Sequence, residues 1–137
     1  MLQSFPLLAL SLVAYALLTF VSGGENSAWQ DTEAMRVQLM SGDAWRISGG
    51  HLFIALALLL LFVELLRATR SGSSSLLNHA FSVLVFVAAL LLFLLVPGYG
   101  NSTFFLFMCM TLLDFMAGFI ITTVTARRDL SFGRATD

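Results

Sequence analysis

The chain has 137 residues, of which 58% are hydrophobic and only 11% are charged, and its formal net charge at pH 7 is −1. A soluble domain of this length would expose far more charge, and a nucleic-acid-binding protein would carry a basic surface, so the composition argues against both classes. The single cysteine, Cys109, excludes an internal disulfide.

Four apolar runs divide the chain. A helix needs about 20 apolar residues to cross the hydrocarbon core of a bilayer. The runs that meet this length are 5–22, 47–66, 76–96 and 104–125. We therefore predict an all-α fold: one integral membrane four-helix bundle over residues 1–137. A secretory signal peptide is the alternative for the first run, but no Lys or Arg precedes that run.

The loop after the first run is the largest polar segment. Ser27 followed by Gln30 is typical of a capping box, which predicts a short helix over about 28–40. Its scattered apolar residues favour a helix that lies on the outer surface of the membrane. A docking surface for an outer-side partner is the alternative. Trp29, Trp45 and Tyr99 fall on the same side and are expected to anchor that interface.

Arginine placement orients the four runs. Arg67 and Arg70 lie between the second and third runs, and Arg127, Arg128 and Arg134 follow the fourth. The loop between the first two runs holds two arginines against four acidic residues. The positive-inside rule therefore places both termini in the cytoplasm and predicts a multi-pass protein. The Lys-free composition is typical of a bacterial protein, so we expect the bacterial inner membrane.

An acidic residue interrupts the fourth run. Asp114 would cost roughly 2.5–3.5 kcal/mol at the centre of a bilayer, so its stripe of the helix must face protein. The residues that share this stripe at helical spacing are Thr111, Gly118, Thr122 and Thr125. On the first run, Tyr15 and Ser11 face one side, and Tyr15 is our predicted partner for Asp114. This intramembrane polar site is either packing glue or a proton or cation site.

A second polar group is predicted at the inner side. It consists of Glu64, Arg67, Asn78 and His79. Glu64 and Arg67 are three residues apart on one helix face, which favours an ion pair at the interface. The alternative makes Glu64 the point where protons are taken up on the way to Asp114.

Motifs for catalysis, metals or cofactors do not stand out. His51 and His79 fall at opposite ends of their runs, so one chain could not place both on one haem iron. Met108, Cys109, Met110 and Met116 resemble a soft-metal site only in composition, because consecutive residues on a helix point apart. We expect no cofactor, no metal site and no enzyme activity.

Residues 51–133 resemble a group of small multi-span bacterial inner-membrane proteins to which no activity is attached. Three stretches carry this resemblance: residues 62–66 running into Thr69 and Arg70, residues 78–80, and residues 114–119 followed by 126–129. The resemblance implies a multi-span inner-membrane protein and singles out Glu64, Asp114, Arg127 and Arg128. The size and span number also resemble small multidrug transporters, but those carry an essential acid in their first span, which has none here.

These observations favour a non-catalytic accessory, assembly or scaffold subunit. Its expected partners are membrane lipid and either further copies of itself or a larger membrane complex. The alternative is a small proton-coupled transporter or channel subunit that uses Asp114. An enzyme acting on lipid is the least supported class, because only the inner-side polar group favours it.

Overall fold

The computed structural model describes residues 6–68 and 75–133, and the side chains of these residues except at 68, 75–79, 121–122 and 124–133. Four helices dominate the described part: α1 (Leu7–Val21), α2 (Gly49–Ala68), α3 (Ser75–Leu95) and α4 (Ser102–Gly133). A short 3₁₀ helix, η2 (Gly24–Asn26), and a two-stranded sheet, β1 (Glu33–Gln38) and β2 (Ala44–Ser48), lie between α1 and α2. The protein is therefore mostly helical with one small sheet.

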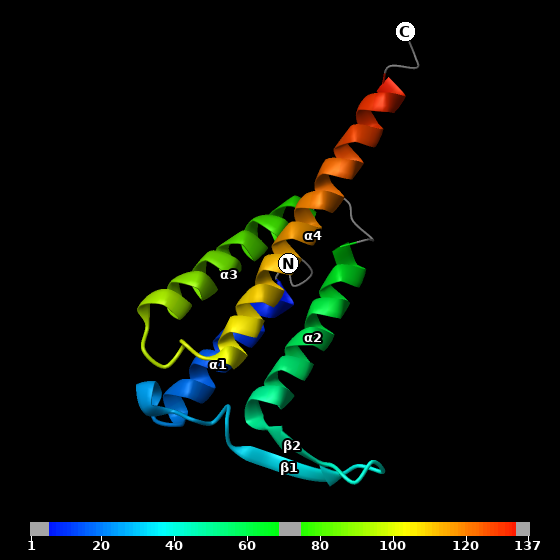
Figure 1. Ribbon diagram of the computed structural model, residues 1–137. Helices are drawn as coiled ribbons and strands as arrows, with labels where there is room; N and C mark the ends of the chain where they lie inside the picture. The colour runs from blue at the N-terminus through cyan, green and yellow to red at the C-terminus, as the bar shows by residue number, and fades with distance from the viewer. Residues whose placement is uncertain (1–5, 69–74, 134–137) are drawn as a thin grey trace.

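Helices that follow one another in the chain run in opposite directions along the bundle (Figure 1). α4 packs against α2 and α3, and α1 packs against the same two helices. α1 and α4 therefore lie on one diagonal of the bundle. The C-terminal ends of α1 and α3 meet the N-terminal ends of α2 and α4 at one end, where the strands also lie. We call this end the hairpin end.

The buried faces of the helices follow the helical period. On α1 the buried residues are Leu8, Ser11, Tyr15 and Thr19, at spacings of three or four. On α2 they are Phe53, Ala57, Leu61 and Glu64, at the same spacings. Each helix thus turns one narrow stripe inward, which is the geometry of a thin bundle.

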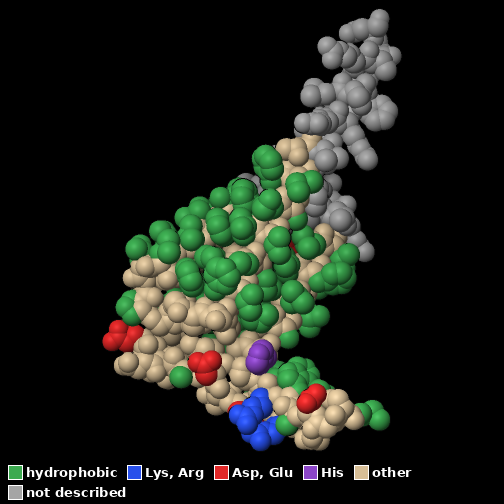
Figure 2. All heavy atoms as spheres, in the orientation of Figure 1, with side chains coloured by type: hydrophobic (Ala, Val, Ile, Leu, Met, Phe, Trp, Pro, Cys, Tyr) green, Lys and Arg blue, Asp and Glu red, His purple; other side chains and the backbone are tan. Residues whose placement is uncertain are grey.

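Large apolar side chains stand exposed along all four helices. Examples are Phe20, Val21, Phe62, Leu95 and Phe119, each at least 59% exposed. Figure 2 shows hydrophobic side chains over the helical body, while most of the visible charged ones gather toward the hairpin end. By length and composition, two helices of the described chain could cross a membrane, over Gly49–Arg67 and Ser102–Ile120. Shorter apolar helices cover Leu7–Val21 and Ala80–Leu95.

The predicted loop helix over 28–40 is wrong: this segment forms a turn and then the first strand of a β-hairpin. β1 and β2 pair antiparallel, with Met35 opposite Ile47 and Val37 opposite Trp45. Gly42 closes the connection with φ +93°, a conformation that glycine adopts without strain. The alternation of apolar and polar residues from Met35 to Leu39 has the period of a strand, and this period prevails over the capping-box signal.

The capping-box residues are used differently from the prediction. Ser27 and Gln30 precede the strand, and the Gln30 side-chain amide donates to the Ser27 carbonyl at 3.4 Å. Backbone bonds from Asp31 to Ala28 and from Thr32 to Trp29 form local turns there. These two residues therefore lie in local turns before the strand and not in the first turn of the predicted short helix.

The four predicted helical runs coincide closely with α1 to α4. Their boundaries differ by up to two residues, except at the end of α4, which continues to Gly133 instead of ending near Thr125. This extension passes beyond the apolar run into a polar sequence, and Figure 1 shows it projecting past the other helices. Helical propensity and the absence of Pro or Gly between Thr125 and Gly133 allow the helix to continue.

Candidate functional site

Asp114 is buried between helices, with 5% of its surface exposed. Its carboxylate accepts a hydrogen bond of 2.6 Å from the hydroxyl of Ser82 on α3, which is 1% exposed. This bond joins two helices through a polar contact in an otherwise apolar region. The bond is short enough to be a strong one, as hydroxyl bonds to carboxylates are.

Glu64 contacts the first turn of α1. The backbone N–H of Leu8 donates to one carboxylate oxygen of Glu64 at 3.3 Å, and Glu64 is 3% exposed. The N-cap residue of α1 is Pro6, which offers no side-chain cap to the free N–H groups of that turn. A residue 56 positions later in the chain therefore supplies the cap, and the positive end of the α1 dipole favours its negative charge.

The two carboxylates lie at a similar level of the bundle. Glu64 is 15 residues from the start of α2, and Asp114 is 12 residues from the start of α4. Their partners Leu8 and Ser82 are each 13 residues from the hairpin-end terminus of their helices. At 1.5 Å per residue, all four lie about 18–22 Å from that end. We call Glu64, Ser82, Asp114 and the N–H of Leu8 the polar layer.

The stripe predicted around Asp114 faces protein where its side chains are described. Thr111 and Gly118 are both buried. The Thr111 hydroxyl donates to the carbonyl of Met108 on its own helix at 2.7 Å, so this hydrogen is not given to a neighbouring helix. Thr122 and Thr125 lie on α4, but their side chains are outside the described residues.

The predicted contact between Tyr15 and Asp114 gives way to different partners for both residues. Tyr15 is fully buried, and its hydroxyl accepts a hydrogen bond of 2.8 Å from the side chain of Asn101. Its ring packs on Phe104, with the centroids 4.7 Å apart. Phe104 precedes Asp114 by ten residues, or about 15 Å along α4, which accounts for the change of partner. Ser11, one turn further from the hairpin end, is buried at 5% exposure.

Aromatic rings fill the bundle between the polar layer and the hairpin end. The rings of this aromatic cluster are Tyr15, Trp29, Phe53, Tyr99, Phe104 and Phe107. Tyr15 lies at its centre and contacts four of the others at centroid distances of 4.7–5.6 Å. Close packing of this kind disfavours a continuous column of water. The cluster thus separates Asp114 from the hairpin end.

The predicted interface anchors divide into two kinds. Trp45, on β2, is 52% exposed. Trp29 instead packs on Tyr15 and Phe53, and its indole N–H donates to the hydroxyl of Thr19 at 3.2 Å. Tyr99 also packs into the aromatic cluster. Two of the three rings therefore hold the end of the bundle together.

The inner-side polar group is described only in part. Arg67 is exposed near the end of α2, while the side chains of Asn78 and His79 lie outside the described residues. The ion pair between Glu64 and Arg67 stays a prediction. His51, at the other end of α2, is exposed and bonded to Ser48, where the Ser48 N–H donates to its ring nitrogen Nδ1 at 3.1 Å.

The sequence did not predict the roles of two residues that make these contacts, Ser82 and Asn101. Ser82 is one serine among many, so only the packing of α3 on α4 identifies it. Asn101 carries a recognisable signal, because it directly precedes α4 and its side chain accepts the N–H of Phe104 at 2.9 Å, as an N-cap does. Among the described residues no group of three or more His, Cys, Asp or Glu side chains could hold a metal ion.

Chemically, the polar layer offers two buried carboxylates that can each hold a proton or accept hydrogen bonds from neighbouring helices. Comparison with models of protein families, with curated proteins and with solved structures found no match to this chain.

Proposed function

We propose that this chain is a multi-pass protein of the bacterial inner membrane that acts as a non-catalytic accessory, assembly or scaffold subunit. The observation that carries the membrane part is the exposure of large apolar side chains along all four helices. Water-soluble monomers rarely expose contiguous apolar patches larger than a few hundred Å². Contact with lipid acyl chains would remove this apolar surface from water.

The polar layer supports the structural role. A carboxylate in lipid is costly, whereas a carboxylate hydrogen-bonded between helices fixes their relative positions. Asp114 joins α4 to α3 through Ser82, and Glu64 joins α2 to the first turn of α1. The two bonds join different pairs of helices, so each of the four helices takes part in one of them. A subunit that presents fixed surfaces to partners needs this kind of rigidity.

Membrane extraction followed by native mass spectrometry tests the proposal. We expect the chain to stay in the membrane pellet after washing at high pH and to enter solution only with detergent. In gentle detergent we expect a homo-oligomer or a complex with another membrane protein. Release by the alkaline wash would refute the membrane assignment, and a monomer without a bound protein would refute the subunit role.

A small proton-coupled transporter or channel subunit is the second candidate. The observation that favours it is the presence of two buried carboxylates at one level of the bundle. In this role Asp114 would bind the ion, and Glu64 would lie on the inner access route. The aromatic cluster argues against an open path from the hairpin end.

Proton flux into liposomes distinguishes the two candidates. If the chain transports, Asp114→Asn should abolish a pH-dependent flux, while Asp43→Asn, at the exposed hairpin turn, should preserve it. Circular dichroism of both variants must match the parent chain. A parent chain without flux, or a flux that survives Asp114→Asn, would exclude the transport role of this residue.

A further inference from the structure

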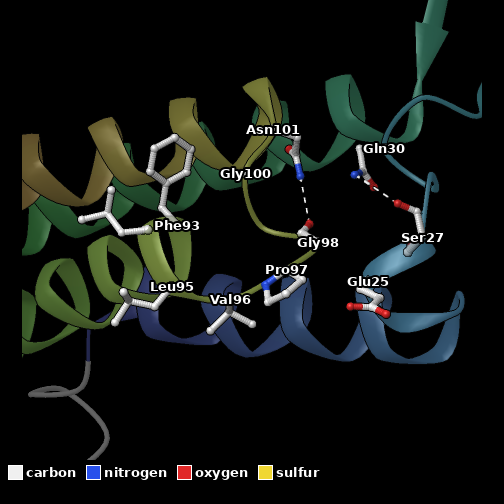
Figure 3. A pocket seen from close by; sticks show the side chains of 11 residues that line it. Glu25, Ser27, Gln30, Phe93, Leu95, Val96, Pro97, Gly98, Gly100 and Asn101 are labelled. Carbon is white, nitrogen blue, oxygen red and sulfur yellow. Dashed lines mark hydrogen bonds between the residues drawn. The ribbon is translucent and has the colours of Figure 1, made fainter.

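A pocket with a volume of about 520 Å³ lies at the hairpin end, outside the polar layer (Figure 3). One side is formed by Glu25, Ser27 and Gln30, and the other by the end of α3 and the turn to α4, residues 93–98 together with 100 and 101. Gly98, at φ +88°, brings this turn close to Glu25, because a Cβ there would lie 3.1 Å from the Glu25 Cα. The volume falls within the range of ligand pockets, roughly 300–1,000 Å³.

Two buried polar atoms in the pocket wall have no hydrogen-bond partner within the described part of the chain. They are the hydroxyl oxygen of Ser27 and the side-chain carbonyl oxygen of Gln30. Ser27 is 9% exposed and Gln30 is 7% exposed. A buried acceptor left without a donor is destabilising. A ligand that brings N–H or O–H groups would recover this free energy.

The charge of the pocket is negative. Among the described residues that line it, Glu25 alone is charged. The wall contains both the C-terminal end of α3 and Asn101, the N-cap of α4, so the partial charges of the two helix ends oppose each other and Glu25 sets the sign. The carbonyl oxygen of Gln30 adds a further acceptor. These groups together favour a cation that can donate hydrogen bonds, and they disfavour an anion.

The remaining wall is apolar. Phe93, Leu94 and Leu95 line the pocket beside Val96 and Pro97. Leu94 and Leu95 are 64% and 72% exposed, so the apolar side opens outward onto the surface of α3. A chain attached to the cation can follow this surface.

We propose that this pocket binds a primary ammonium group attached to an apolar chain. The ammonium donates to the Gln30 and Ser27 oxygens and lies near the Glu25 carboxylate, while its chain runs along the end of α3. An ethanolamine phospholipid and a free amphiphilic amine share this chemistry. The inference does not depend on the subunit or transport role of the protein.

Calorimetric titration of the purified chain in a neutral detergent with n-octylammonium tests the site. We expect saturable binding that is weakened about tenfold or more by Glu25→Gln, as loss of a charge-assisted bond predicts. Asp31→Asn, an equal charge change on the same segment but outside the lining, should leave Kd within about twofold. n-Octyltrimethylammonium, which has the same charge but no N–H, should bind at least about tenfold more weakly.

Two results would overturn the proposal: equal binding of the two ammonium probes, or equal effects of Glu25→Gln and Asp31→Asn. Gln30→Met keeps the size of the side chain and removes its acceptor, and it should also weaken n-octylammonium binding. Circular dichroism of each variant establishes that it folds. If Gln30→Met folds and binds as the parent chain does, the buried acceptor is not part of the site.

The source of the ammonium group is distinguished in nanodiscs. Titration in phosphatidylcholine with phosphatidylglycerol is compared with titration in phosphatidylethanolamine with phosphatidylglycerol. If the lipid headgroup occupies the pocket, the ethanolamine lipid should compete and raise the apparent Kd of n-octylammonium. If the pocket takes free amines, the two values should agree. Both results support the site and assign its source, whereas no binding in either bilayer would overturn it.

Discussion

At the scale of single residues, the sequence did not predict that Ser82 is the hydrogen-bond partner of Asp114. Helical periodicity predicted that Asp114 faces protein, because Thr111, Asp114 and Gly118 repeat at spacings of three and four. It could not identify the partner, since that depends on how α3 lies along α4. The prediction that Tyr15 contacts Asp114 assumed that both residues lie at one depth, but they are separated along the axis of the bundle. Helix periodicity therefore predicts which face is buried, but not what it contacts.

Replacing Ser82 by Ala should destabilise the bundle by about 1–3 kcal/mol. The substitution removes the hydroxyl that donates to Asp114 at 2.6 Å and leaves that carboxylate oxygen with one donor fewer in a buried place. Unfolding in detergent, followed by circular dichroism, measures the change. Thr123→Val is the control, because the Thr123 hydroxyl is exposed and bonds only to its own helix, so the change should stay within about 0.5 kcal/mol. If both variants lost the same free energy of unfolding, the bond from Ser82 to Asp114 would not stabilise the bundle.

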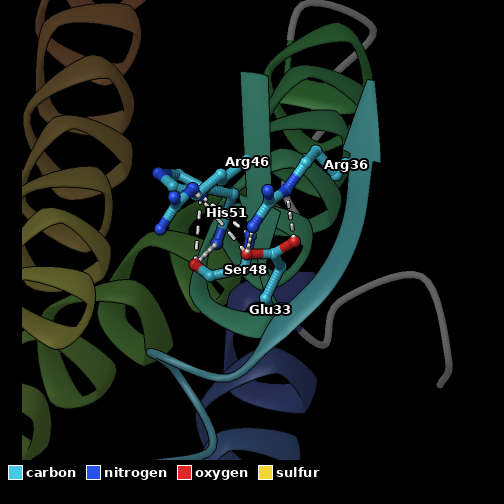
Figure 4. A network of polar contacts seen from close by, with 5 residues as sticks. All are labelled: Glu33, Arg36, Arg46, Ser48 and His51. Atoms are coloured by element: carbon cyan, nitrogen blue, oxygen red, sulfur yellow. Dashed lines mark hydrogen bonds and ion pairs between the residues drawn. The ribbon is translucent and has the colours of Figure 1, made fainter. Parts of the chain in front are cut away.

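Glu33 on β1 should titrate below its ordinary pKa of 4.5. The hydrogen bond from Arg36 lowers the pKa most, and the charges of Arg36 and Arg46 lower it further (Figure 4). The ionised form therefore adds to the stability of the hairpin above the ordinary pKa, and this contribution disappears as the pH falls through the lowered pKa. Carboxyl ¹³C shifts of labelled glutamate measure it. Arg36→Gln should raise the pKa of Glu33 toward 4.5, while Arg67→Gln should leave it unchanged. A Glu33 pKa of 4.5 in the parent chain would contradict the ion pair between Glu33 and Arg36.

At the scale of elements, the helices were predictable and the hairpin was not. Apolar runs of about 20 residues identify helices because no other open structure satisfies the backbone in lipid. The segment between α1 and α2 is too polar for that argument, and its capping-box spacing competed with a period-two alternation. The bulge between Glu33 and Met35 hides that alternation further, because it puts Glu33 on the same face as Arg36 and Arg46. Met35, Val37 and Trp45 lie on the opposite, apolar face.

The start of α2 depends on a glycine for its close packing. A Cβ at Gly50 would clash with the hydroxyl of Thr103 on α4 and would lie 2.9 Å from the backbone carbonyl of Gln30. Because the backbone cannot rotate away, Gly50→Ala should destabilise the protein by about 1–3 kcal/mol. Thermal unfolding in detergent measures the loss. Gly100→Ala is the matched control, since nothing lies within 4 Å of a Cβ there, and a similar melting temperature for both variants would contradict this packing.

At the scale of the whole molecule, charge is distributed unevenly along the axis of the bundle. The segment between α1 and α2 carries an excess of acidic residues, whereas arginines follow α2 and the apolar part of α4. The alternating direction of successive helices puts that segment and the α3–α4 turn at the hairpin end, so the acidic excess gathers there. This charge asymmetry could be predicted from the sequence. Only the fold shows that the acidic segment, the aromatic cluster and the proposed ammonium pocket all lie toward the hairpin end of the bundle. In a membrane, the positive-inside rule would place the hairpin end outside.

Cysteine labelling in intact bacterial cells tests this orientation. In a Cys109→Ala background, Ser41→Cys at the hairpin turn should react with a membrane-impermeant maleimide added from outside. Ser73→Cys, in the segment between α2 and α3, should react only after the cells are broken, because α2 would separate it from the hairpin end by about 30 Å. The reverse pattern would invert the protein in the membrane. Labelling of both positions in intact cells would mean that α2 does not cross the bilayer, and the four-span arrangement would then be wrong.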